Sequence, residues 1–402
     1  MSSSEPTPFG REMRKKHFLF SPALTPLNHG GYGAFPATVR TAQRHFQDEQ
    51  ESWPDLWFQR SRRQHIDVSR RAIAKLVHAD VEDCVFVTNT STGLDIVLRN
   101  LEFGAGDVVV TFATTYYAVQ NTLLSVMEMS PVQMRKVEYT FPIAHDEIVQ
   151  KFLEVVRKAK NEGLNVRAAV VDTIVSVPGV RFPFEKLVKA CKDEGILSIV
   201  DGAHGVGQIS LDLGQLDPDF FLTNCHKWLY TPRGCALFYV PKRNQYLIQT
   251  PLPTGVGYVS TSKRGQTHSE FRSLFDFVAT SDDTAWMCLP AALKFRDEAC
   301  GGEEAIYTYL QKIAREGGDK IAEILGTEVM QEPGLEDSEL RRCAMVNVRL
   351  PLGFKNGTVN TNVLDPSTSP YSLLEVEDAG RVEAWLKYKL MIEFHTMLVG
   401  CG

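Results

Sequence analysis

The amino-acid sequence predicts an α/β protein in which a parallel or mixed β-sheet carries helices on both faces. Short, continuous apolar runs recur from about residue 84 to residue 240, and amphipathic helical patterns separate them. Continuous apolar runs are typical of strands buried on both faces, and strands that alternate with helices favour a parallel sheet. With 402 residues, the chain is long enough for a large domain and a smaller one.

Three regions are expected from changes of pattern along the chain. Residues 1–35 are rich in proline and glycine and include LNHGGYGAFP, which predicts an irregular arm that covers another part of the protein. Residues 36–285 are predicted to form the large domain. Residues 286–402 are predicted to form a small C-terminal domain, with the arm packed near the functional site.

The large domain is expected to begin with helices, from residue 36 to about residue 79, and then to alternate. The predicted strands are 84–89, 107–112, 132–138, 166–175, 196–203, 219–224 and 236–240. The predicted helices between them are 91–103, 118–128, 145–163 and 183–195.

The rest of the chain is less regular. Residues 241–284 are polar and rich in Gly, Ser and Thr, which predicts a long exposed loop that is functional or reaches a partner. In the small domain, the pattern predicts a helix from Leu289, a strand at 344–350 and a helix at 377–391.

Composition excludes several classes of function. The net charge is -6, with 43 basic and 49 acidic residues and no basic stripe, so nucleic acid is not an expected partner. Eight cysteines without a CxxC pair indicate neither a metal site nor a disulfide framework. No apolar run has the length of a signal peptide or a membrane span, which predicts a cytoplasmic protein without a membrane partner.

Polar residues follow several of the predicted strands at their carboxyl ends, where ligands bind in such sheets. These residues are Asn89, Thr111, Asp172, Asp201 and Lys227. A lysine and a carboxylate at one sheet edge are suited to an electron-withdrawing aldehyde such as pyridoxal 5'-phosphate. Lys227 would form an imine with the aldehyde, and Asp201 would keep the pyridine nitrogen protonated.

The same cofactor needs a phosphate-binding site and an aromatic side chain that stacks on its ring. Ser91, Thr92 and Gly93 open the first helix after the first strand, where backbone N–H groups bind phosphate, and His226 would lie beside them. Tyr116 follows the next strand and would stack on the ring. Taken singly, such residues are more often surface lysines, turn aspartates or helix caps. Their order on successive strand ends favours one shared site.

The motifs carry a family resemblance. DGAHGVGQ and DFFLTNCHKWLYTPRGCALFYVP resemble the active-site signature of the class V aminotransferase family, the fold-type I enzymes that use pyridoxal phosphate. LNHGGYGAFP, NTSTGLDIVLRNL and TIVSVPGVRFPFE resemble the branch that contains isopenicillin N epimerase-like proteins, hercynylcysteine sulfoxide lyases and the pyrrolizidine-forming enzyme of loline biosynthesis. The similarity runs from about Phe9 to Val348.

This resemblance implies a seven-stranded, mostly parallel sheet and a small α+β C-terminal domain. It implies that Lys227 holds the cofactor, that Asp201 pairs with the pyridine nitrogen and that His204 approaches the ring hydroxyl. Asp172 would orient the surroundings of Asp201, and Tyr116 would stack on the ring.

The resemblance also implies a homodimer with shared active sites, in which Thr280 of the other subunit reaches the phosphate. The arm residues expected to contact the amino-acid substrate are Asn28, His29 and Tyr32.

One departure from the family concerns the substrate carboxylate, which relatives bind with an arginine in the C-terminal domain. No arginine follows Arg381. We therefore expect either a truncated C-terminal domain or a carboxylate site elsewhere, with Arg60, Arg62 and Arg63 as examples.

The sequence leaves the reaction open. The leading hypothesis is a lyase that acts on an amino acid with a Cβ or Cγ substituent, in particular a C–S lyase of secondary or thiol metabolism. The alternatives are a decarboxylating cyclase or an epimerase, and a non-catalytic relative that binds the cofactor. A cysteine desulfurase is disfavoured because Cys343 lies in an apolar, strand-like segment and Cys401 at the terminus.

Overall fold

The computed structural model describes residues 5–255, 257–263, 270–335, 337–354, 372–374 and 379–397. Its centre is a seven-stranded sheet in the order β1-β9-β8-β7-β4-β2-β3. The strands are β1 (Cys84–Val87), β2 (Asp107–Phe112), β3 (Gln133–Val137), β4 (Asn165–Asp172), β7 (Leu197–Asp201), β8 (Phe220–Asn224) and β9 (Ala236–Tyr239). Strand β9 runs antiparallel to both of its neighbours and the other pairs are parallel, which confirms the mostly parallel α/β fold.

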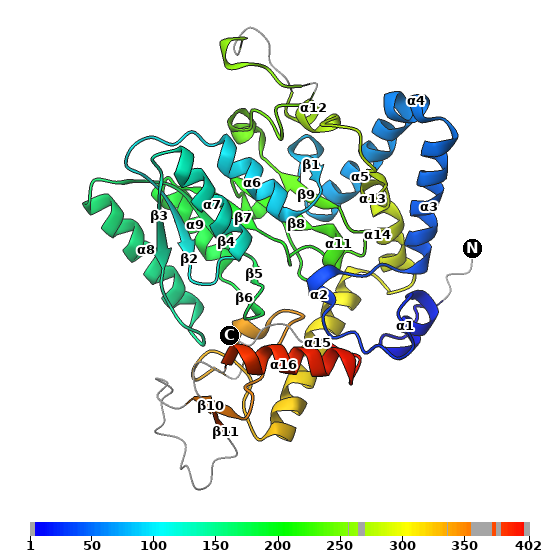
Figure 1. The fold of residues 1–402 in the computed structure, drawn as a ribbon, viewed down its shortest axis with the longest axis vertical. Coiled ribbons are helices and arrows are strands. Elements are labelled where there is room, and N and C mark those ends of the chain that lie inside the picture. Colours follow the sequence, from blue (N-terminus) through cyan, green and yellow to red (C-terminus); the bar gives the residue numbers. More distant parts are fainter. Residues whose placement is uncertain are drawn as a thin grey trace.

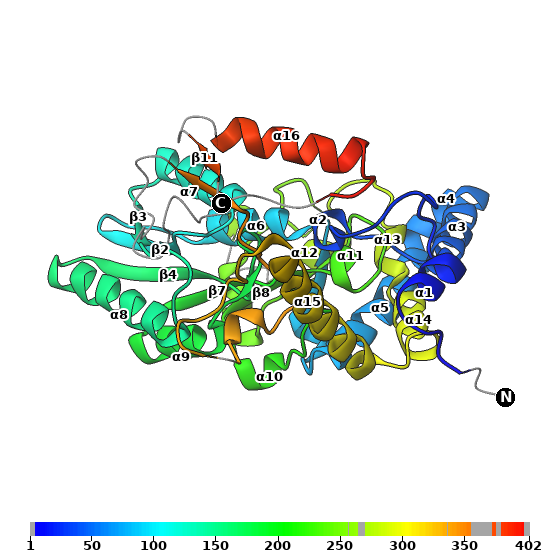
Figure 2. The same cartoon turned by 90° about the horizontal axis from the view of Figure 1, so that it is seen from below.

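Helices cover both faces of this sheet, as Figure 2 shows. Helices α6 (Thr90–Asn100) and α7 (Tyr117–Met129) pack on one apolar core, and α5 (Arg62–Leu76), α8 (His145–Asn161) and α9 (Phe184–Glu194) pack on the other. Strand β2 serves both cores, because Val109 faces the first and Val108 and Val110 face the second. The sheet is therefore buried on both sides, which explains its continuous apolar runs.

The predicted strands and helices of this region are confirmed, with boundaries that differ by a few residues. One predicted strand, 166–175, divides into β4 and the two-residue β5 (Ile174–Val175), which pairs with β6 (Val180–Arg181). Shorter elements connect the strands: η2 (Val81–Asp83), α10 (Leu213–Leu216) and α11 (Cys225–Trp228).

The N-terminal region contains α1 (Arg11–His17), α2 (His29–Tyr32), α3 (Ala37–Ser52), α4 (Pro54–Leu56) and η1 (Trp57–Ser61), followed by α5. Helix α2 lies against α11, directly below the sheet in Figure 1. The N-terminal segment and the turn that follows β8 therefore meet at the edge of the sheet.

The chain after β9 corrects two predictions. The elements are η3 (Lys242–Leu247), η4 (Thr261–Lys263), α12 (Phe271–Asp276), α13 (Thr284–Met287), α14 (Leu289–Glu298), α15 (Glu303–Leu325), η5 (Glu339–Arg341), β10 (Leu352–Phe354), β11 (Ser372–Leu374) and α16 (Ala379–Ile392). The predicted loop at 241–284 is wrong in part, because α12 buries Phe271 and Phe275 in the core. The predicted strand at 344–350 is also wrong, since only Val348 forms a bridge, with Val329.

The expected helix at 377–391 corresponds to α16. Helix α14, which follows the expected domain boundary at residue 285, packs on α3 and α5 of the preceding region. The division into an arm, a large domain and a small domain stays a prediction.

Candidate functional site

Lys227 lies on α11, the turn that begins where β8 ends. The Nζ atom of Lys227 lies 3.0 Å from Nε2 of His204. Burial lowers the pKa of the Lys227 amine to about 8, and the negative charge of Asp201 offsets part of that effect. The amine is therefore closer to its uncharged, nucleophilic form at neutral pH than an ordinary lysine is.

Two buried carboxyl groups lie at the same edge of the sheet. Asp172 and Asp201 end β4 and β7 and are direct partners in the register of these strands. Burial raises the pKa of Asp201, and burial together with the neighbouring Asp201 charge raises the pKa of Asp172 well above its ordinary value. The N–H of Ala203 donates to Oδ1 of Asp201 at 3.0 Å. The site can therefore stabilise a cationic group placed against these acids.

His204 lies between Lys227 and the next residue, Trp228. The indole Nε1 of Trp228 donates to Nδ1 of His204 at 3.2 Å. Burial, followed by the charge of Lys227, lowers the pKa of His204 well below its ordinary value. The imidazole is therefore uncharged.

The first turn of α6 lies at the same edge. Asn89 caps the helix by accepting the N–H of Thr92 at 2.8 Å, and Ser91 and Thr92 are exposed. Gly93 is buried against Leu222 of β8, so close that an added Cβ would lie 1.9 Å from the Leu222 Cδ2 atom. The helix start therefore offers two hydroxyl groups at the surface, while its glycine permits the helix to lie close to the sheet.

Two positioning residues were not predicted from the sequence. Oδ1 of Asn224 accepts the N–H of Thr90 at 3.0 Å, which joins the start of α6 to the lysine turn. The buried Arg296 donates to the carbonyl of Trp228 at 2.8 Å and to that of Gly207 at 3.1 Å. The sequence could have indicated a role for Asn224, because this residue directly precedes the Cys-His-Lys segment of the lysine turn. No sequence motif near Arg296 indicates that it contacts this turn.

The N-terminal arm covers the lysine turn. Nε2 of His29 donates to the carbonyl of Lys227 at 2.8 Å, and burial lowers the pKa of His29 to about 4. Gly33 has a left-handed φ of 67°, and an added Cβ there would lie 1.7 Å from the carbonyl oxygen of His226. Arg233 donates to the carbonyls of Tyr32 and Gly33 at 3.1 and 2.8 Å. The arm therefore needs glycine where it crosses the turn.

The remaining predicted residues lie around this centre. Nδ1 of His226 donates to the carbonyl of Cys235 at 2.9 Å. Tyr116 precedes α7 and packs against Tyr117, with 4.5 Å between the ring centroids. Burial raises the pKa of Tyr116 to about 12, with contributions from Tyr117 and from the charges of Asp201 and Tyr32.

The arm residue Asn28 accepts the N–H of Gly31, and Tyr32 is 75% exposed. Thr280 is exposed in the segment between α12 and α13. The contacts expected of these residues with cofactor and substrate stay predictions.

Arg62 is poorly suited to bind a substrate carboxylate. It is buried, and its guanidinium bonds to the carboxylate of Asp283 and to the carbonyl of Asp276. Arg63 pairs with the Asp276 carboxylate at 3.2 Å, whereas Arg60 is exposed. The buried ion pair with Asp283 therefore uses the guanidinium donors of Arg62.

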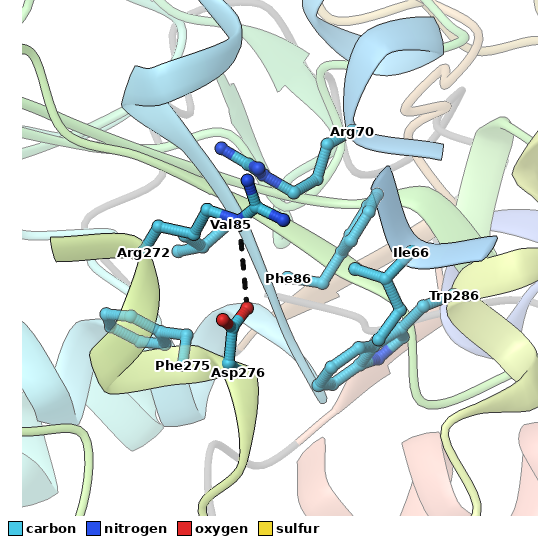
Figure 3. A pocket seen from close by; sticks show the side chains of 8 residues that line it. All are labelled: Ile66, Arg70, Val85, Phe86, Arg272, Phe275, Asp276 and Trp286. Atoms are coloured by element: carbon cyan, nitrogen blue, oxygen red, sulfur yellow. Dashed lines mark ion pairs between the residues drawn. The ribbon is translucent and has the colours of Figure 1, made fainter. Parts of the chain in front are cut away.

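Other kinds of site are not indicated in the described residues. Figure 3 shows a cavity of about 10 Å³ near the ion pair of Arg272 and Asp276, which are 3.8 Å apart, and no predicted site residue lines it. Across the described ranges, no group of three His, Cys, Asp or Glu side chains is placed to hold a metal ion. Nor is any described helix both long and apolar enough to cross a membrane.

The structure is a fold-type I α/β fold with a largely buried lysine, Lys227, at the carboxyl edge of its sheet. The sequence matches the family Aminotransferase class-V over residues 55–353, and the chain belongs to this family. The family expected from the sequence motifs is thereby confirmed.

Individual relatives refine this placement. The chain is 42% identical to the L-cysteine desulfhydrase-like protein lolT1 of Epichloe uncinata, covering 92% of this chain and 82% of that protein. It is 32% identical to the hercynylcysteine sulfoxide lyase of Schizosaccharomyces pombe, covering 86% and 84%. A solved structure of a C-DES mutant with glycine covalently linked to its PLP cofactor superposes with a TM-score of 0.67 at 18% identity, covering 82% and 84%. At 18% sequence identity, this structural similarity supports the fold alone.

Proposed function

We propose that this protein is a pyridoxal-phosphate-dependent C–S lyase that acts on a cysteine-derived amino acid. It is an enzyme of the class V aminotransferase family, and pyridoxal phosphate is its cofactor. The observation that carries the proposal is the Lys227 amine, which lies 3.0 Å from His204 at the edge that holds Asp201 and Asp172.

The residues at this edge fit the cofactor. Among the buried side-chain oxygens that have no hydrogen-bond partner within the described residues, four lie at or near strand ends or at the start of α6: Thr90 Oγ1, Thr111 Oγ1, Asp172 Oδ2 and Thr173 Oγ1. Unpaired buried oxygens are costly in a folded protein, and a polar ligand would supply partners. Burial raises the pKa of Asp201, and burial with the Asp201 charge raises the pKa of Asp172. A cationic ring nitrogen would stabilise the charged form of Asp201.

Each side chain has a role in this proposal. Lys227 would hold the aldehyde, Asp201 would bind the ring nitrogen with Asp172 behind it, and His204 would donate to the ring hydroxyl. The remaining cofactor ligands would be Ser91, Thr92, Gly93 and His226 at the phosphate and Tyr116 on the ring. Once bound, pyridoxal phosphate withdraws electrons from the substrate Cα, so that its proton becomes acidic and a β-sulfur substituent can leave.

Lys227 would take the Cα proton in this scheme, because a released amine with a pKa of about 8 is an effective base near neutral pH. The arm contacts the lysine turn through His29 and Gly33, which supports the proposal that Asn28, His29 and Tyr32 contact the substrate.

A nucleophilic cysteine is not part of the proposal. The seven cysteines within the described residues are buried, and burial raises the pKa of the Cys343 thiol to about 11. Reactive thiols are instead exposed and have lowered pKa values. Cys401 lies outside the described residues. Elimination of a sulfur group, which needs only the lysine and cofactor, is therefore favoured over desulfuration by thiol attack.

The relatives support a C–S reaction. The names L-cysteine desulfhydrase-like protein and hercynylcysteine sulfoxide lyase both describe chemistry at a cysteine sulfur, and these proteins are 42% and 32% identical to this chain. The more distant isopenicillin N epimerase, at 24% identity, keeps epimerisation as an alternative. A decarboxylating cyclase and a non-catalytic cofactor-binding protein are the further outcomes that the experiment must separate.

The test is incubation of the cofactor-loaded protein with L-cysteine and with S-substituted cysteine sulfoxides. A lyase should release pyruvate, ammonia and a sulfur product in equal amounts. Lys227→Ala should release none, and Lys158→Ala, which changes an exposed lysine on α8, should behave like the wild type. Carbon dioxide in place of pyruvate would favour the cyclase, and inversion at Cα the epimerase. No product from any amino acid would favour the binding protein.

We also propose a cytoplasmic homodimer in which Thr280 of each subunit completes the phosphate site of the other. Thr280 is exposed and lies in a segment distant in sequence from Lys227, so its side chain is accessible to a second subunit, which supports this arrangement. Sedimentation of the wild type and loss of cofactor affinity in Thr280→Ala without dissociation of the dimer would support it. A monomer that binds the cofactor fully would exclude it.

A further inference from the structure

The imidazole of His204 is held between two nitrogen groups. On one side, Nε1 of Trp228 lies 3.2 Å from Nδ1, and on the other side Nζ of Lys227 lies 3.0 Å from Nε2. His204 and Trp228 are both buried, at 4% and 5% exposure. Water is therefore a poor substitute for either partner.

The chemistry of these three groups fixes the position of the imidazole proton. An indole N–H can only donate, so Nδ1 of His204 must accept and carries no proton. A neutral imidazole has one N–H, which must then lie on Nε2 and point at Lys227. The Lys227 nitrogen can accept that hydrogen bond only with a free lone pair, which an ammonium group lacks.

We propose that Trp228 is a positioning residue that holds His204 in the tautomer protonated at Nε2 and thereby keeps the Lys227 amine uncharged. The proposal deepens the proposed function, because the uncharged amine is the form that attacks an aldehyde. It also implies that His204 presents a donor, and not an acceptor, to an oxygen of the bound cofactor. The protonated lysine would require the opposite tautomer, which would place two N–H groups against each other at Trp228.

Other titratable groups face this cluster and act in different directions. Asp201 on β7 favours the charged lysine, and Asp172 on β4 lies beside Asp201. His29 bonds to the Lys227 carbonyl, and the pKa of His226 on α11 is lowered by burial and partly by the Lys227 charge. In the described part of the chain, the partners recorded for the two His204 ring nitrogens are Trp228 and Lys227. The tautomer is therefore set by Trp228.

The direct test is the ¹⁵N NMR spectrum of the full-length, cofactor-free protein with labelled histidine, assigned through a His204→Gln variant. The expected result is an N–H signal from Nε2 of His204 and an unprotonated Nδ1 at pH 9, where the Lys227 amine, with a pKa of about 8, is mostly uncharged. A proton on Nδ1 would overturn the proposal. This measurement needs no Trp228 variant, so it stands even if such a variant fails to fold.

A second test measures the pKa of Lys227 itself in the cofactor-free protein, from the pH dependence of its acetylation rate followed by peptide mass spectrometry. Trp228→Phe removes the indole N–H and should raise the pKa of Lys227 by roughly half to one unit, the effect of about one hydrogen bond. Trp57→Phe is the matched control, because Trp57 is buried at 2% exposure in η1, against Phe46 and His65.

Equal pKa values of Lys227 in the wild type and Trp228→Phe would contradict the proposal, as would an equal rise in Trp57→Phe. Both tests omit the cofactor, so they are independent of the reaction. A protein that showed the expected tautomer and lysine pKa but released no product would retain this inference and lose the lyase assignment.

Discussion

Substitution of Gly30 by alanine tests whether the arm packs closely against the proposed site at Trp228 and His204. A Cβ atom on Gly30 would lie 2.8 Å from Cζ2 of Trp228 and 3.3 Å from Cε1 and Nδ1 of His204. Ordinary contacts begin at 3.4 Å, so either the arm or the indole must move by about 0.6 Å. Neither ring can turn away freely, because Trp228 and His204 are buried and bonded to each other.

The expected cost follows from overpacking of a well-filled region, which is typically about 1–3 kcal/mol. If the arm moves outward, the 2.8 Å bond from His29 to the Lys227 carbonyl is lost as well. We expect Gly30→Ala to weaken cofactor affinity by roughly 5- to 100-fold, since about 1.4 kcal/mol corresponds to a factor of ten. Equilibrium titration with pyridoxal phosphate, followed by absorbance, measures this affinity, and urea unfolding measures stability.

Gly31→Ala is the matched control. The three atoms nearest to its added Cβ would all belong to the side chain of Asn28, the first at 2.8 Å, and Asn28 lies in the arm itself and is half-exposed. That side chain can turn away, so cofactor affinity should change less than threefold. Equal affinities for the wild type, Gly30→Ala and Gly31→Ala would refute a close contact between the arm and the centre.

Three further predictions concern the amine of Lys227, the side chain of Asn224 and the thiol of Cys343. The rate at which the cofactor attaches to the cofactor-free protein should fall about tenfold per pH unit below pH 8 and level off above it. The reason is that burial lowers the pKa of Lys227 to about 8 and only the uncharged amine reacts. Stopped-flow absorbance measures this rate and should show no inflection near 10.5, the pKa of an ordinary lysine. Asn224→Ala leaves the N–H of Thr90 without its acceptor and should lower the free energy of unfolding by about 1–3 kcal/mol in urea, while Asn224→Asp, which keeps an oxygen there, should lose less. Cys343→Ala should retain turnover within about twofold, and loss of turnover with normal cofactor binding would show that a thiol takes part.

The sequence predicts the sheet and the strand-end residues because both follow from local pattern. Asp172, Asp201 and Lys227 each end or follow a buried apolar run, and parallel strands bring their carboxyl ends to one edge. The segment 344–350 has a strand-like apolar pattern but forms a bridge only at Val348, and the N–H of Ala344 donates to the side chain of Gln208 and not to a neighbouring strand.

Contacts between distant segments have no such local signal. The bond from Thr90 to Asn224 spans 134 residues, and the bonds of Arg296 to the lysine turn span 68 or more. The ion pair between Arg62 and Asp283 likewise depends on how α5 packs against the segment before α13. These partners become visible only in the packed structure, and they determine which arginines remain free for substrate.

The visible absorption spectrum of the purified protein with pyridoxal phosphate tests the central claim most directly. After unbound cofactor is removed, the wild type should keep a cofactor band that borohydride fixes to one peptide, the peptide that contains Lys227. Lys227→Ala should lose the fixed band, and Lys158→Ala should keep it. A wild type that stays colourless, or a cofactor fixed to another lysine, would contradict the assignment of Lys227 as the residue that holds the cofactor.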